Sequence, residues 1–166
     1  MNPIHLVAMG NPVMSDDGAG PLVLEALAVK KWPAPVIFHN TGTVSLAYSA
    51  MLREPGRIII VDALCGGRPP GTVSRTRADS LCLRSDTAFS LHDLHLLHLT
   101  ARFYPHRLTD IQVFGIEPLN LNPGLTPSAA VSRTLPLLTR AVSRQIMRYI
   151  QPLSPSLSHA KTKGAI

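Results

Sequence analysis

The fold is decided by the stretch Arg57-Ile58-Ile59-Ile60-Val61-Asp62. Four consecutive β-branched apolar residues are typical of a strand that is buried on both faces, as the strands of a parallel sheet are. We therefore expect a central strand at 57–62, in a sheet with helices on both sides.

Strands and helices alternate on either side of this stretch. Short apolar runs that end in turn residues predict strands over 4–9, 36–40 and 110–116, with a weaker strand near an edge over 71–76. Apolar stripes at helical spacing predict helices over 20–31, 45–52, 90–103 and 126–149, the last with Pro127 in its first turn. This alternation predicts a three-layer α/β fold with a mostly parallel, twisted sheet and helices on both faces.

The length of 166 residues suits a single domain with its own hydrophobic core. We expect this α/β domain to cover residues 1–150, followed by a flexible tail over 151–166 that is rich in Ser, Pro, Lys and Ala. The two cysteines, Cys65 and Cys82, are not spaced as a redox or zinc pair, so we expect reduced, mostly structural thiols.

Composition and charge limit the classes of partner. No apolar run is long enough to span a bilayer, and the first ten residues carry no basic leader, so we expect a cytoplasmic protein without a membrane partner. The formal net charge of +6 comes largely from scattered arginines, while aromatic residues make up only 5% of the chain. Nucleic-acid sites cluster such charge, so we expect no nucleic-acid partner. The same excess of arginine is equally what a basic surface that faces an acidic protein would show.

Functional residues of such a sheet are expected where its parallel strands end, because ligands bind beyond the carboxyl ends. The first strand runs into the loop Gly10-Asn11-Pro12-Val13-Met14-Ser15-Asp16-Asp17-Gly18-Ala19-Gly20, which contains neither of the glycine-rich phosphate-binding patterns. An oxidoreductase or nucleotide-binding domain is therefore disfavoured. A covalent hydrolase is disfavoured too, because the chain has no G-x-S-x-G elbow and neither cysteine has a base at motif spacing.

Two adjacent acids stand in this first loop. A carboxylate at a helix start can simply cap the helix, and we expect this role for one of Asp16 and Asp17. Capping needs only one side chain, and Gly18 and Gly20 indicate a backbone that something must approach closely. Asp17 is the better candidate for a ligand-binding acid.

A second acid, Asp62, ends the central strand and could either turn the chain or bind a ligand. Because the first and third strands lie close together in most doubly wound sheets, Asp17 and Asp62 can converge, and two close carboxylates call for a shared proton or cation. His92, at the start of the third expected helix, would complete a site for a first-row divalent ion such as nickel or zinc. Spacing alone does not separate His92 from His95 and His98, which could all be ordinary residues of a helix face.

Five ordered motifs between Ile4 and Tyr149 give the chain a family resemblance. They are the loop from Gly10 to Gly20, the apolar strand that ends in Asp62, the Ser-x-His helix start at 90–92, Gly115-Ile116-Glu117-Pro118 and Gly124-Leu125-Thr126-Pro127. With these motifs the chain resembles the [NiFe]-hydrogenase maturation endopeptidases, which remove a C-terminal extension from the hydrogenase large subunit after nickel insertion. One departure is the end of the second strand, where Asn40-Thr41-Gly42-Thr43 replaces the family's usual Asp-Gly-Gly-Thr turn, so a binding role of that acid does not carry over.

The resemblance implies that Asp17, Asp62 and His92 are the metal-binding and catalytic positions, and it selects His92 over His95. It further implies a monomeric hydrolase that acts on the precursor of the large subunit, with nickel carried by the substrate and no organic cofactor. The ion could polarise the scissile carbonyl or activate a water molecule, or a carboxylate could act as base. The alternative is a non-catalytic metal-sensing or docking module in hydrogenase assembly.

Substrate choice should depend on variable loops near residues 65–84 and 103–107. We expect the arginines in these loops to face an acidic partner surface.

Overall fold

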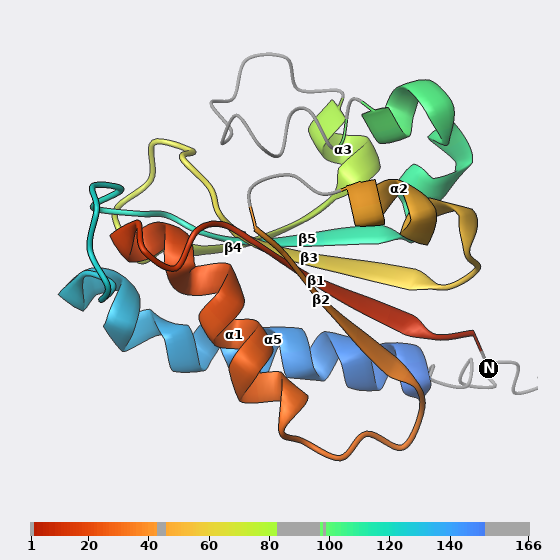
Figure 1. Cartoon of the computed structure of the whole chain (residues 1–166), viewed down its shortest axis with the longest axis horizontal. Coiled ribbons are helices and arrows are strands. Elements are labelled where there is room, and N and C mark those ends of the chain that lie inside the picture. Colours follow the sequence, from red (N-terminus) through yellow and green to blue (C-terminus); the bar gives the residue numbers. More distant parts are fainter. Residues whose placement is uncertain (1, 43–45, 83–96, 98, 152–166) are drawn as a thin grey trace, which may run out of the picture.

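A computed structural model of the chain describes residues 2–42, 46–82, 97 and 99–151. Figure 1 shows one sheet with helices on either side. The strands are β1 (Ile4–Met9), β2 (Val36–Gly42), β3 (Arg57–Ala63), β4 (Val73–Arg77) and β5 (Ile111–Ile116). The helices are α1 (Ala19–Ala28), α2 (Leu46–Arg53), α3 (Ala78–Cys82) and α5 (Ala129–Ile150), with 3-10 turns at η1 (Ser15–Gly18) and η2 (Pro105–Asp110).

The sheet has the strand order β2-β1-β3-β5-β4, with β3 at its centre. The first four strands in this order are parallel, and β4 pairs with β5 in the antiparallel direction at the edge. The expected mostly parallel α/β sheet, its central strand and its weak edge strand are therefore confirmed. The antiparallel direction of β4 has a simple cause, since the short connection from β3 leaves no room for the helix that a parallel return would need.

Alternate residues of the central strands pack into two separate cores. Ile59 and Val61 of β3 face a core that α1 and α5 close, whereas Ile58 and Ile60 face a core that includes residues of α2 and α3. Figure 1 shows the two helix layers on opposite faces of the sheet. The run of β-branched residues in β3 thus fills both cores at once, as the sequence pattern predicts.

Two helix ends differ from the prediction. Helix α1 ends at Ala28 and not at Lys31, because the backbone N–H of Lys30 and the indole N–H of Trp32 both donate to the Leu27 carbonyl, at 3.2 Å each. Helix α5 begins with Ser128 as its N-cap, whose hydroxyl accepts the N–H of Val131 at 3.3 Å. Pro127 therefore precedes the cap and does not lie in the first helical turn.

The third predicted helix falls largely outside the described residues, which include its last turn as helix over 99–103. Residues 152–166 of the predicted tail also lie outside them. Among the helices that the structure describes, none is both long and apolar enough to cross a membrane.

Candidate functional site

The two predicted acids lie at the same edge of the sheet, because the strands that lead to them are parallel neighbours. Asp17 lies in η1, directly after the loop that leaves β1, and Asp62 lies near the end of β3, the neighbour of β1. The turn η1 also contacts β3. Both carboxylates therefore stand at the carboxyl edge of the sheet, on neighbouring elements.

Asp17 is half-buried, and it closes its own loop. Its Oδ2 atom accepts the backbone N–H of Asn11 at 2.6 Å. Gly10, with φ of +108°, permits this closure because a Cβ at this position would lie 1.9 Å from the Asp17 carbonyl oxygen. The loop is thus folded tightly around the Asp17 carboxylate.

Asp16, the adjacent acid, is fully buried and has a structural role. Its Oδ2 accepts the N–H groups of Leu119 and Asn120 at 2.8 and 2.9 Å, and its Oδ1 accepts that of Ser128, the N-cap of α5. Burial alone would raise the pKa of this carboxyl, but the three backbone donors outweigh burial and the pKa is lowered.

This arrangement resolves the two roles expected for the adjacent acids. One acid is structural, as predicted, but Asp16 does not cap the helix that follows it. It instead binds N–H groups more than one hundred residues away in sequence and ties η1 to the loop before α5. Asp17 remains the candidate for binding a ligand.

Asp62 is fully buried, and its Oδ1 accepts the backbone N–H of Ala63 at 2.7 Å. A buried carboxylate is costly without partners that stabilise its charge, and this N–H is one of them. Since the side chain is covered in this structure, an ion reaches it only if covering groups move aside.

A third acid, Glu117, organises the turn that follows Asp62. Glu117 directly follows β5 and is largely buried, and its carboxylate accepts the N–H groups of Gly66 and Gly67 at 2.9 to 3.1 Å. In the sequence, Glu117 stands within the Gly115-Ile116-Glu117-Pro118 motif, and no role is predicted for it there. The sequence carries a signal for this role, because Glu117, like Asp62, stands at the carboxyl end of a strand of the same sheet.

The glycines after Asp17 serve the packing of the protein itself. A Cβ at Gly20 would lie 2.3 Å from the Met9 carbonyl oxygen and 2.6 Å from that of Val61. A close approach was expected here, and the approaching groups are the ends of β1 and β3. Gly20 therefore lets the start of α1 sit directly against the sheet edge that carries the acids.

The end of β2, where the family's usual acid is replaced by Asn40, is neutral and tied to β1. The hydroxyl of Thr41 donates to the Ala8 carbonyl at 3.0 Å, and the N–H of Gly10 donates to the Gly42 carbonyl at 3.0 Å. Gly42 has φ of +59° with open space where a Cβ would stand, so glycine is favoured there by backbone conformation alone.

His92, the third predicted ligand, lies outside the described residues, as do His95 and His98. Within the described part of the chain, no three His, Cys, Asp or Glu side chains gather as metal ligands. Asp17 and Asp62 alone would supply carboxylate oxygens, and an imidazole from another segment would complete a donor set that suits a first-row divalent ion.

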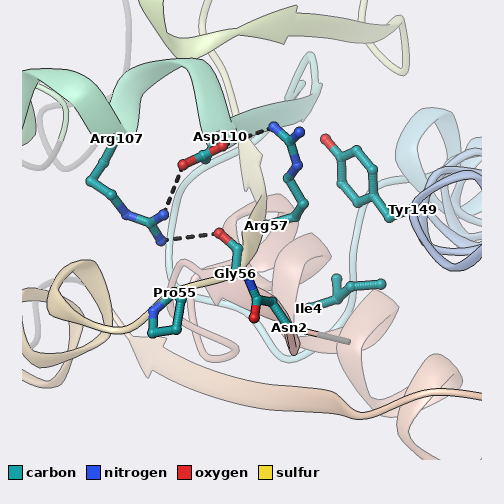
Figure 2. Close-up of a pocket in the computed structure, with 8 residues that line it drawn as sticks. All are labelled: Asn2, Ile4, Pro55, Gly56, Arg57, Arg107, Asp110 and Tyr149. Atoms are coloured by element: carbon teal, nitrogen blue, oxygen red, sulfur yellow. Dashed lines mark hydrogen bonds and ion pairs between the residues drawn. The ribbon is translucent and has the colours of Figure 1, made fainter. Parts of the chain in front are cut away.

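The opposite edge of the sheet holds a cavity of about 330 Å³, which Figure 2 shows with its lining residues. Here the carboxylate of Asp110 accepts hydrogen bonds from both Arg57 and Arg107, at 2.8 and 2.7 Å. Arg107 also donates to the Gly56 carbonyl at 3.1 Å and is largely buried. The expectation that the arginines of 103–107 face a partner is thus wrong for Arg107, which fastens η2 to the start of β3.

A protein-family model described as hydrogenase maturation protease matches residues 21–145 of the chain. The match includes the positions of Asp62 and His92 and begins after Asp17. No curated protein sequence matches the chain.

Solved structures with this fold are similar to the chain over most of its length. The hydrogenase maturating endopeptidase HybD from Escherichia coli aligns with a TM-score of 0.77 at 20% identity, covering 88% of this chain and 93% of that one. The [NiFe] hydrogenase maturation protease HybD from Thermococcus kodakarensis aligns with a TM-score of 0.70 at 22% identity, covering 87% and 99%. A second protease from the same organism, HycI, aligns with a TM-score of 0.68 at 23% identity, covering 88% and 93%.

Proposed function

The chain belongs to the hydrogenase maturation protease family, which makes it a hydrolase, and we propose that it removes the C-terminal extension of a [NiFe]-hydrogenase large-subunit precursor after nickel insertion. The observation that carries this proposal is the placement of Asp17 and Asp62 at one edge of the sheet, on neighbouring elements. Carboxylates so placed can bind a divalent ion, which would offset their mutual repulsion.

In this proposal the nickel belongs to the substrate. Asp17, Asp62 and His92 supply two carboxylates and one imidazole, leaving further coordination positions for the ligands that the precursor already provides. Binding of the loaded ion then seats the adjacent peptide segment, so cleavage follows only when nickel is present.

The local structure fixes the loops that carry the two acids before substrate arrives, and only the groups that cover Asp62 must move aside. Asp16 and Glu117 hold the loops around Asp17 and Asp62 through backbone N–H groups, and Gly20 sets α1 against both strand ends. Preorganised groups lose less conformational freedom when they bind an ion or a transition state.

The test is processing of a nickel-loaded precursor by Asp17→Asn and Asp62→Asn variants, followed by gel electrophoresis. Each change keeps the side-chain shape but removes the negative charge that binds a cation, so we expect processing to fall by about a hundredfold or more. Glu25→Gln is the matched control, because Glu25 is exposed on α1 away from the strand ends. Normal processing by both Asn variants would refute the assignment, and precursor binding without cleavage by the wild type would instead favour a docking module.

A further inference from the structure

Four exposed apolar side chains stand on two loops at the carboxyl edge of the sheet. They are Val13, Leu119, Leu121 and Leu125, which are 50%, 63%, 41% and 82% exposed. We call this set the apolar rim. Single exposed apolar residues are common on protein surfaces, but a group gathered on joined loops indicates an interaction site.

Backbone hydrogen bonds join the two loops into one unit. The N–H of Gly124 donates to the Val13 carbonyl at 3.0 Å, and the N–H of Ser15 donates to the Gly124 carbonyl at 2.8 Å. Ser15 takes a positive φ of 50° in this contact, and its hydroxyl donates to the Asn122 carbonyl at 2.9 Å. These hydrogen bonds therefore hold the two loops that carry the rim in a fixed relative position.

The same unit positions Asp17. The buried carboxylate of Asp16 binds the N–H groups of Leu119 and Asn120, and Asp17 follows directly in η1. A substrate held at Asp17 must therefore lie beside the rim. The rim is continuous with the proposed recognition site for the precursor.

The chemistry of the rim selects an apolar partner. Residues 10–15 and 118–128 contain no charged side chain, although the whole chain carries 26 Lys, Arg, Asp and Glu residues (16 basic plus 10 acidic). An uncharged surface with leucines offers burial but no ion pairs. A charged segment would find no ion-pair partner within the rim loops themselves.

We propose that the apolar rim is the docking surface for an apolar segment of the hydrogenase large-subunit precursor, next to the nickel that Asp17 and Asp62 would bind. This inference rests on the proposed function and adds the surface that binds the polypeptide itself. It separates two tasks, since the rim supplies affinity for the precursor whether or not nickel is present, and the acids respond to the ion.

The experiment measures binding of purified nickel-free precursor to the full chain by biolayer interferometry, so that docking is observed without cleavage. The test variants are Leu125→Ser and the double change Leu119→Ser with Leu125→Ser. The control is Val29→Ser, which is matched in exposure at 85% but lies at the far end of α1. Light scattering of each protein records whether copies of the chain associate.

We expect the double variant to bind the precursor at least tenfold more weakly, a factor in keeping with the lost burial of two leucine side chains, and Val29→Ser to bind as the wild type does. Unchanged binding by the double variant would overturn the proposal, as would equal weakening by the control. A wild-type dimer that the double variant loses would also overturn it by giving the rim to a second copy. If the wild type fails to cleave loaded precursor yet the rim variants still lose binding, the proposed function fails and the docking surface stands.

Discussion

Replacing the buried acid Asp16 should destabilise the protein far more than the same change at its neighbour Asp17. Asp16 accepts three backbone N–H groups in a fully buried setting, whereas half-buried Asp17 accepts that of Asn11. Leaving a buried donor unsatisfied costs about 1–3 kcal/mol. Asn at position 16 keeps one acceptor oxygen and turns an amide N–H toward the remaining donor.

From these contacts we expect Asp16→Asn to lower the free energy of unfolding by about 3 kcal/mol, and Asp17→Asn by about 1 kcal/mol or less. A loss of 3 kcal/mol is a large share of the stability of roughly 5–15 kcal/mol typical of a domain. Urea unfolding followed by circular dichroism measures both values.

The pH dependence of the same variants gives a second, independent comparison. Because the folded-state pKa of Asp16 is lowered, its charge stabilises the fold above the unfolded pKa of 3.8, and this contribution is lost as pH falls through the folded pKa. The difference between wild type and Asp16→Asn should therefore be full at neutral pH and shrink below about pH 4. An Asp16→Asn variant within about 0.5 kcal/mol of wild type would refute this division of roles, because about 0.5 kcal/mol is usual for a neutral surface change. An Asp17→Asn variant that loses more stability than Asp16→Asn would refute it as well.

Three further predictions concern the turn after Asp62, a histidine pair and metal content. Glu117→Gln should slow processing by roughly tenfold and lower the free energy of unfolding by about 1–3 kcal/mol, because one amide oxygen replaces the carboxylate that holds Gly66 and Gly67. Steady-state kinetics measures the effect, with Glu25→Gln as the control. A Glu117→Gln variant that processes precursor as fast as this control and the wild type would contradict the prediction. His5 and His39 share a 3.0 Å contact between ring nitrogens, and burial, with the two rings' mutual repulsion at His5, lowers the pKa of each below 6.5. The unfolded chain then binds protons first, so the stability of the wild type should fall as pH drops below about 6.5. The double variant His5→Gln with His39→Gln should lose less stability over this interval. If its urea midpoint fell between pH 7.5 and 5.5 by as much as that of the wild type, the prediction would be wrong. The native protein should be purified without stoichiometric nickel, and elemental analysis that finds one tightly bound ion per chain would contradict a substrate-borne metal.

The fold was predictable because its decisive signal is local. The apolar residues of β3 and the run of Ile4–Met9 are buried strands whichever partner they take, and their alternation with amphipathic helices leaves few topologies. The direction of β4 was not predictable from its own residues, since an edge strand with polar side chains suits either direction. It depends on the length of the connection from β3.

The acids of the site likewise fall into two groups, those that local sequence identifies and those whose role depends on distant residues. A carboxylate at the end of a buried strand, or in the loop that leaves one, is visible in sequence, which is why Asp62 and Asp17 could be selected. The role of Asp16 depends on N–H groups of residues 119, 120 and 128, and no local pattern links these positions. The partnership of Glu117 with Gly66 and Gly67 is likewise a contact between two separate strand ends.

The measurement that tests the central claim most directly is the intact mass of the large-subunit precursor after incubation with the wild-type protein, with and without nickel in the precursor. The account predicts loss of the C-terminal extension from the nickel-loaded form and an unchanged mass for the nickel-free form. Loss of the extension from both forms at the same rate would contradict recognition of nickel by Asp17, Asp62 and His92.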